Sequence, residues 1–483
     1  MRKALVLVVL IASGGLATAQ KISKWDLRRC VEYAMANNIS VKQADIQART
    51  SEILLKQSRY QQYGQLNYNL QHGFSFGRSL NQTTNIFQDA NIMYENQGLQ
   101  GQITLFNWGS LRNNVASNRY ANEADRAAVD KARNDIALNV ANQYLRALLS
   151  KEQIAVNETQ LRQTQAQYLN TRKQVDAGSL PELNAAELDA QVARDSAAVI
   201  QSKVQYELDL LTLKGLLNLP ADEPFELETP PVDRIPIDNI LEQDPASVYR
   251  MAVNTQPQIK GNQLRLLSAQ KAYDASRGRL WPTISAFGSL QTRFNQNFTT
   301  FTQTGTREVA TGSYIKSGTG TVPVFAQVPQ ITTGSLGLAN SFDGYWGQLN
   351  NNFGKVFGFS VNVPIFNGWQ AKANVEQSKL DIQRANLSIT RDTLQLKQDI
   401  YNAYQQAFGA YNTFMARDKA VRTAERSFEL STKRYEAGVQ QTIEWQQNQN
   451  NLTRARIDRL IAQYNYVFAM KVLEFYKGQG LRL

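Results

Sequence analysis

The chain has 483 residues, of which 42% are hydrophobic, and a formal net charge of +11 at pH 7. Its mean hydropathy of -0.42 describes a water-tolerant chain. The basic residues are scattered among acids and glutamines, as on solvated helix surfaces, so we expect no nucleic-acid partner. The single histidine and single cysteine leave no Cys/His metal cluster and no Cys-His or Ser-His-Asp constellation. We therefore expect no enzyme activity, no metal and no cofactor.

The N-terminus has the pattern of a secretory signal. Arg2 and Lys3 precede an apolar run, and Ala17-Thr18-Ala19 forms an A-x-A cleavage site. The sequence predicts a signal peptide over residues 1–19 and a mature start at Gln20. No other stretch reaches the roughly 18 apolar residues of a membrane helix, so any contact with a membrane must be made by strands.

An internal duplication defines the organisation of the chain. Residues 101–217 match residues 361–477 at a constant offset of 260, and residues 34–42 match residues 252–260 at an offset of 218. The difference between the offsets places an insertion, rich in Gly, Thr, Ser and Asn, before the second strand of the second copy. We predict two copies of one unit, over residues 20–218 and 246–483, each containing a helix, a β-hairpin with a tolerant loop, a long helix and a return helix.

The predicted hairpins, residues 65–106 and 283–366, alternate apolar and polar side chains over lengths that could span a bilayer. A soluble antiparallel sheet with one buried face would show the same alternation. Large aromatic residues on the apolar faces and the export signal favour membrane strands. Four strands cannot close a barrel, so several chains would form a ring. The residues predicted to face lipid are Tyr68, Leu70, Phe74, Phe76, Phe357, Phe359, Val361 and Val363.

The long helices are predicted over residues 110–176 and 369–437. The first lacks both proline and glycine, and at about 1.5 Å per residue it would extend roughly 100 Å. Apolar residues recur every seven positions, which predicts a left-handed supercoil. A four-residue step, Ile136 to Val140 and Leu396 to Ile400, interrupts the repeat at the same place in both copies. The main series are Val140, Ala147, Ile154, Leu161, Tyr168 and Val175, and Ile400, Ala407, Phe414, Val421, Phe428 and Tyr435.

Glycines end both long helices and predict two helical hairpins. Return helices should follow over residues 182–217 and 442–477. Residues 219–245, rich in proline and acids, predict an extended connector between the copies. Asp244 before Pro245 should cap the next helix. The hairpin tips are predicted at Gly178, Ser179, Leu180, Gly438 and Val439.

The chain resembles the TolC-like outer membrane factor (outer membrane efflux protein) family. The resemblance rests on the signal peptide, the duplicated units, the FNWG and FNGW segments after the second strands, and AG at both tips. It implies a mainly α fold with membrane β structure: a homotrimer in which four strands per chain form a twelve-stranded outer-membrane β-barrel and the helices form a periplasmic α-barrel. It also implies a periplasmic adaptor and an inner-membrane pump or secretion transporter as partners, and outer-membrane lipid around the strands.

The resemblance places a periplasmic gate at the hairpin tips, where the adaptor would dock. The tyrosine before the tip glycine matches Tyr435, and the first constricting acid matches Glu444. The sequence departs from the family pattern at Gln440, where a basic residue is usual, and at Gln447, where a second acid is usual. Asn184 stands at the position of Glu444 in the first copy.

These observations predict a passive exit duct of a tripartite efflux or type I secretion system, located in the outer membrane and extending into the periplasm. A surface adhesin or structural coiled-coil rod, with residues 295–352 as a binding head, is the alternative. A hydrolase would need a second histidine or a paired-acid pocket.

Overall fold

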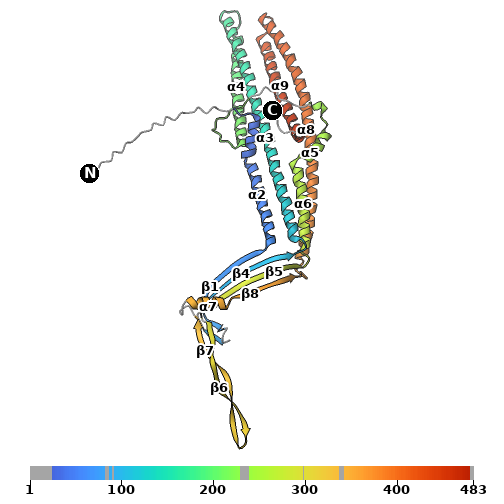
Figure 1. The fold of residues 1–483 in the computed structure, drawn as a ribbon. Coiled ribbons are helices and arrows are strands. Elements are labelled where there is room, and N and C mark those ends of the chain that lie inside the picture. The colour runs from blue at the N-terminus through green and yellow to red at the C-terminus, as the bar shows by residue number, and fades with distance from the viewer. Residues whose placement is uncertain are drawn as a thin grey trace, which may run out of the picture. The chain divides into compact units, whose positions relative to one another are not determined.

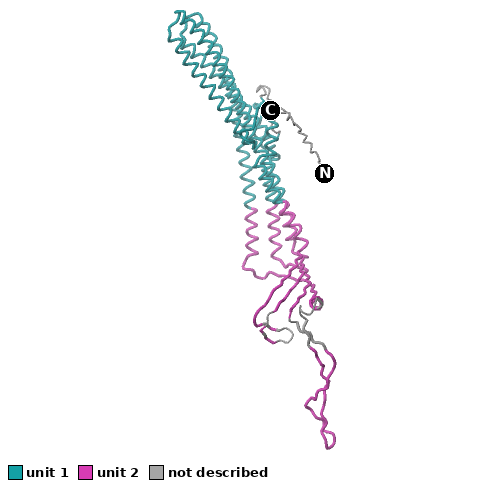
Figure 2. The backbone as a smooth tube through the Cα atoms, turned by 90° about the vertical axis from the view of Figure 1, so that its left-hand side faces the viewer, with its two compact units in different colours: residues 1–51, 120–266, 383–483 teal, residues 52–119, 267–382 magenta. Residues whose placement is uncertain are grey.

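The computed structural model describes residues 24–81, 86–89, 92–228, 239–296, 298–336 and 342–478; the predicted signal peptide lies outside them. The chain divides into two compact units (Figure 2). The first contains residues 1–51, 120–266 and 383–483, and the second contains residues 52–119 and 267–382. Within the described residues, no helix combines the length and the apolar character that a membrane-spanning helix requires.

The fold is mostly helical, and the two copies repeat the same order of helices (Figure 1). The first copy has α1 (Leu27–Asn37), α2 (Ile39–Tyr60), α3 (Ser110–Asp176) and α4 (Glu182–Leu217). The second has α5 (Pro245–Thr255), α6 (Pro257–Gly278), α8 (Gln370–Glu436) and α9 (Thr442–Tyr476).

The first helix of each copy is divided in two, which the sequence prediction did not include. Asn38 is extended between α1 and α2, and its side chain accepts a hydrogen bond from the Ser40 N–H. Gln256 is extended between α5 and α6, because the residue before Pro257 is biased away from the helical conformation. Asp244 caps α5 by accepting hydrogen bonds from the N–H groups of Ala246 and Ser247.

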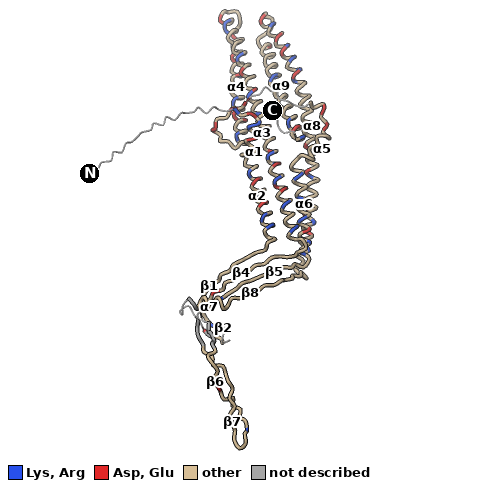
Figure 3. The backbone as a smooth tube through the Cα atoms, in the orientation of Figure 1, with Lys and Arg blue, Asp and Glu red and all other residues tan. Residues whose placement is uncertain are grey.

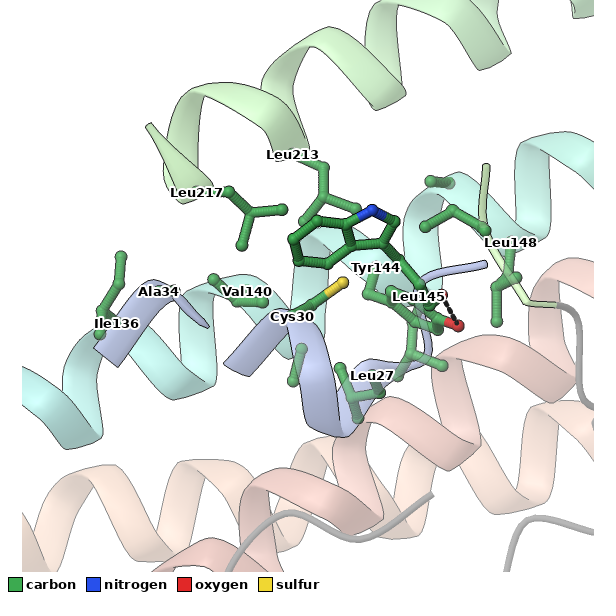
Figure 4. Packing of buried hydrophobic residues seen from close by; sticks show 14 of the residues in the cluster. Leu27, Cys30, Ala34, Ile136, Val140, Tyr144, Leu145, Leu148, Leu213 and Leu217 are labelled. Atoms are coloured by element: carbon green, nitrogen blue, oxygen red, sulfur yellow. Dashed lines mark hydrogen bonds between the residues drawn. The ribbon is translucent and has the colours of Figure 1, made fainter. Parts of the chain in front are cut away.

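The described residues of the first unit form two hydrophobic cores. One surrounds the fully buried Cys30 and Tyr144 and includes Val140, Leu148 and Leu213 (Figure 4). Burial raises the pKa of the Cys30 thiol to about 12, so this thiol is protonated and unreactive at neutral pH. The second core contains Ile240, Val248, Ile400, Met470 and Leu473. Val140, Ala147, Ile400 and Ala407, from the predicted seven-residue series, are all fully buried.

The described start of the predicted connector is tied to the N-terminal segment. The Trp25 N–H donates to the Glu226 carbonyl (2.9 Å), and the Glu228 N–H donates to the Trp25 carbonyl (3.0 Å). The Tyr144 hydroxyl donates to the carbonyls of Glu228 (2.7 Å) and Trp25 (3.2 Å), so a buried side chain fixes both segments to α3. Residues 229–238 of the connector lie outside the described part of the chain.

The second unit contains an antiparallel sheet in the order β1-β4-β5-β8, with bounds Gln65–Ser75, Ile92–Phe106, Thr283–Asn295 and Gly354–Asn362. The hairpins of the two copies join through β4 and β5. Residues that pair across antiparallel strands share a face, so the register decides which side chains lie together. One face, here called the apolar face, carries Tyr68, Leu70, Phe74, Leu99, Ile103, Leu290, Phe357, Phe359 and Val361.

The insertion in the second copy is structured rather than a loop. It contains β6 (Phe298–Ser317) and β7 (Gly320–Leu336), which form a long antiparallel ribbon, followed by α7 (Phe342–Asn351). Among the residues that the structure describes at this place in the first copy are two short strands, β2 (Arg78–Asn81) and β3 (Ile86–Asp89). The prediction of a tolerant loop was wrong here, because threonine and valine are strong strand formers even among glycines.

Candidate functional site

The two hairpin tips of the first unit have the same backbone conformation. Gly178 and Gly438 follow the long helices with φ of 75° and 72°, a left-handed conformation that favours glycine. The Ser179 N–H bonds the Gln174 carbonyl (2.9 Å), and the Val439 N–H bonds the Arg434 carbonyl (3.0 Å). These bonds satisfy the last carbonyls of α3 and α8 and reverse the chain into α4 and α9.

An aromatic cluster closes the second tip. The Tyr435 ring stacks on Trp445, with centroids 5.4 Å apart, and Phe428 lies 5.7 Å from the same indole. Trp445 is 4% exposed and donates its Nε1–H to Thr432 Oγ1 (3.1 Å). The Tyr435 hydroxyl lies 3.4 Å from Thr171 Oγ1 on α3, so this cluster reaches from the second hairpin to the first.

Ion pairs, rather than aromatic rings, stabilise the first tip. Arg172 on α3 contacts Asp176 (3.0 Å) and, across the turn, Glu182 on α4 (2.6 Å). The hydrogen bond to Glu182, followed by the charges of Asp176 and Glu182, raises the pKa of Arg172. The duplicated sequence has Thr432 and Thr442 at the positions of Arg172 and Glu182, so the second copy cannot form these ion pairs.

Polar side chains also join the two hairpins farther along the helices, away from the tips. Asp195, 8% exposed on α4, accepts hydrogen bonds from Thr164 Oγ1 and Gln191 Nε2, both at 2.7 Å. Three contacts cross to α9: Gln191 with Asn450 (3.2 Å), Gln449 with Thr164 (3.5 Å), and Thr453 with Gln160. We call these residues the polar seam. A cavity of about 530 Å³ lies beside it, lined by residues that include Asn157, Arg194, Asn450 and Arg454.

The apolar sheet face in the second unit is the other candidate site. Its large side chains are exposed: Phe357 is 74% and Phe359 76% accessible. The opposite face is rich in amides and hydroxyls, with Asn67, Asn69, Gln71, Asn96, Gln100, Gln291 and Ser360. One face is therefore suited to an apolar environment and the other to water.

Comparison with protein families matches this chain to the model described as outer membrane efflux protein, over residues 31–219 and 326–479. The chain belongs to the outer membrane efflux protein family. The match covers most of both copies, and it confirms the resemblance that the sequence suggested. A search of curated proteins found no match.

Solved structures of outer-membrane channels share the fold of this efflux-family protein. The outer membrane protein VceC of Vibrio cholerae has a TM-score of 0.71 and 15% identity, covering 94% of this chain and 95% of that one. The open state of the Neisseria gonorrhoeae MtrE outer membrane channel has a TM-score of 0.70 and 18% identity, covering 94% and 88%. The Campylobacter jejuni CmeC outer membrane channel has a TM-score of 0.70 and 15% identity, covering 94% and 86%. The predicted fold class is confirmed.

The predicted gate residues of this family member differ in their exposure and in their contacts. Tyr435 contacts α3, whereas Glu444 and Gln447 are exposed on α9. Gln440 is half-buried, and its Oε1 has no hydrogen-bond partner within the described residues. Asn184 is half-buried near the start of α4. Within this set, the Tyr435 hydroxyl makes a direct contact between the two hairpins.

Sequence reasoning missed Trp445, Thr171 and Asp195. A tryptophan seven residues after the tip glycine, within a stretch of glutamines and asparagines, was an available signal for Trp445. Thr171 and Asp195 are ordinary helix residues in sequence, and only the packing of α3, α4 and α9 gives them a role. Of the residues predicted to face lipid, Phe76 and Val363 lie just beyond β1 and β8, and both are exposed.

Proposed function

We propose that this protein is the outer-membrane exit duct of a tripartite efflux or type I secretion system. The observation that carries the proposal is the two-faced sheet of a protein in the outer membrane efflux family. Its outer strands, β1 and β8, each have a partner on one side only within the described sheet. Open strand edges are not tolerated in lipid, so three copies would close their sheets into one barrel of twelve strands, with the polar face lining the lumen.

The helices of the trimer would line a periplasmic tunnel whose mouth lies at the hairpin tips. Gly178, Ser179, Leu180, Gly438 and Val439 would meet a periplasmic adaptor, which in turn contacts an inner-membrane pump or secretion transporter. The duct itself would be passive, since the transporter supplies the energy.

The closed mouth would be held by contacts between the two hairpins. Tyr435 with Thr171 and the polar seam would keep α8/α9 against α3/α4. Hydrogen bonds suit such a joint, because water can replace them when the hairpins separate. Three copies of Glu444, one per chain, would add a cation-attracting collar at the mouth.

Conductance across planar lipid bilayers tests the duct. Purified wild-type trimers should conduct weakly, and Tyr435→Phe, which removes the hydroxyl contact with Thr171, should increase conductance. Glu444→Ala should lower cation selectivity. Folded trimers with no conductance, even when the tip variants are combined, would overturn the proposal. Deletion of the ribbon, residues 298–336, should leave conductance intact, whereas an adhesin with a binding head there would lose its function.

A further inference from the structure

The short helix α7 replaces a missing strand at one end of the sheet. β8 pairs with β5 from Thr283 to Gln291, so no strand of the described sheet continues the pairing along the last residues of β5 on that side. The α7 residue Gln348 fills this role: its Oε1 accepts from the Asn295 N–H and its Nε2 donates to the Asn295 carbonyl, both at 3.0 Å. Thr292 Oγ1 donates to the Leu349 carbonyl (2.6 Å). These bonds fix α7 beside the end of β5 (Figure 1).

The same helix also covers part of the apolar face. The Tyr345 ring packs on Phe294 at 5.1 Å, and Phe294 is 1% exposed. The Tyr345 hydroxyl donates to Glu95 Oε1 on β4 (2.6 Å), and Glu95 pairs with Phe294 across the two strands. Because Phe294 belongs to the same face as Leu290 and Phe357, α7 lies on the side of the sheet that carries the apolar residues.

The free side of α7 and the turn after it are aromatic. Trp346 is 58% exposed and lies edge-on to Tyr345, with centroids 5.4 Å apart. Phe353 is 46% exposed, and the Lys355 ammonium lies 5.2 Å from its ring. Exposed tryptophan and phenylalanine beside a lysine are typical of the layer where lipid headgroups meet acyl chains.

A second aromatic group stands at the other end of the sheet. Trp108 and Trp281 lie 5.2 Å apart and are both about half exposed. At about 3.3 Å per residue and a tilt of about 40°, the stretch of chain from Trp281 to Thr292 spans roughly 28 Å along the membrane normal. This length is close to the apolar band of about 25 Å that aromatic girdles enclose in membrane barrels.

We propose that α7 is an interfacial helix, with Trp346 and Phe353 in the lipid headgroup layer where the hairpin loops emerge. This inference rests on the proposed function, because it requires that the apolar face contact lipid. The partner is the membrane surface itself. α7 would set the depth of the sheet in the bilayer on one side, as Trp108 and Trp281 do on the other.

Tryptophan quenching by brominated lipid tests this placement. The wild-type trimer and the variants Trp346→Phe and Trp281→Phe are reconstituted in phosphatidylcholine vesicles, brominated either near the carbonyl end of the acyl chain or near its terminal methyl. The chain has six tryptophans, so each variant should lose about one sixth of the emission. The component of wild-type emission that is absent in Trp346→Phe should be quenched more strongly by bromines near the carbonyl end of the acyl chain than by bromines near its terminal methyl. The emission lost in Trp281→Phe, the matched control, should show the same preference.

The outcomes separate this inference from the proposed duct. Quenching of the Trp281 component without quenching of the Trp346 component would leave the duct intact and overturn the interfacial role of α7, as when a sister chain or solvent covers Trp346. Absence of quenching for both components would contradict the membrane-spanning sheet itself. Tyr345→Phe, which removes the bond to Glu95 but keeps the ring on Phe294, should weaken the shallow quenching of Trp346 and leave that of Trp281 unchanged.

Discussion

The indole of Trp445 lies against the phenol ring of Tyr435, with the ring planes 29° apart, and holds that tyrosine toward Thr171 on the neighbouring hairpin. The indole is buried and is itself fixed by its hydrogen bond to Thr432. The first copy has Ala185 at the position of Trp445 and Val175 at that of Tyr435. Of the two tips, the second has the aromatic cluster and the first does not. The two tips should therefore respond differently to mutation and to salt.

Trp445→Ala should weaken the second tip. Removal of a buried tryptophan leaves a cavity and typically costs roughly 3 to 5 kcal/mol. We expect a lower midpoint of thermal unfolding and a higher bilayer conductance, because Tyr435 loses the surface that orients it. Trp445→Phe keeps most of the packing and loses only the bond to Thr432, so its effect should be smaller. An unchanged conductance in folded Trp445→Ala trimers would show that the cluster does not hold the mouth.

The first tip should respond to salt. Arg172 is half-buried, and Asp176 and Glu182 are exposed. At 1 M salt the Debye length falls to about 3 Å, which weakens ion pairs that are open to solvent. A spin label at Ala177→Cys should therefore become more mobile in high salt, and Arg172→Gln should give this mobility already in low salt. A label at Ala437→Cys, in the tip without the ion pairs, is the matched control and should not change. Equal salt responses at both tips would contradict the assignment.

Asp392 should make the first unit sensitive to acid. Its carboxylate accepts hydrogen bonds from Asn262 Nδ2 (2.7 Å) and Gln258 Nε2 (2.9 Å) on α6, and from Arg391. Burial acts to raise the pKa of Asp392, but these hydrogen bonds outweigh it and lower the pKa to about 2. Because the pKa is depressed in the folded state, the stabilisation is present above the unfolded pKa near 4. It is lost as the pH falls toward 2, and it amounts to about 2 kcal/mol.

Thermal unfolding between pH 5 and pH 2 checks this prediction, a window set by the two pKa values. Asp392→Asn should be less stable than the wild type at pH 5, and the difference should shrink as the pH falls. Asp222→Asn, at an exposed carboxylate, should follow the wild-type curve throughout. A constant difference between Asp392→Asn and the wild type across this range would mean that the carboxylate charge contributes nothing.

Features that depend on local sequence were predictable, and features that depend on which surfaces meet were not. The left-handed glycines Gly178 and Gly438 and the shared face of Tyr68, Leu70 and Phe74 follow from turn chemistry and from alternation along one strand. The polar seam depends on which faces of α3, α4 and α9 meet. The sequence of α4 around Asp195 does not indicate that this residue packs against another helix. Gln348 can replace a strand only because β8 begins at Gly354, opposite Gln291, and so leaves the end of β5 without a neighbouring strand; no pattern within α7 reveals this.

Two glycines with positive φ offer a final test, because the space around them differs. Gly64 precedes β1 with φ of 83° and ψ of -165°, and a Cβ there would lie 2.4 Å from the Gln102 carbonyl oxygen on β4. Gly178 has φ of 75°, and no atom of the described residues lies within 4 Å of a Cβ built there. Gly178→Ala should cost only the left-handed conformation, about 1 to 2 kcal/mol. Gly64→Ala must also displace backbone at the start of the β1–β4 pair, so we expect far fewer assembled trimers on gel filtration after extraction. Equal trimer yields for the two variants would mean that β1 does not need the close approach of Gly64 to Gln102.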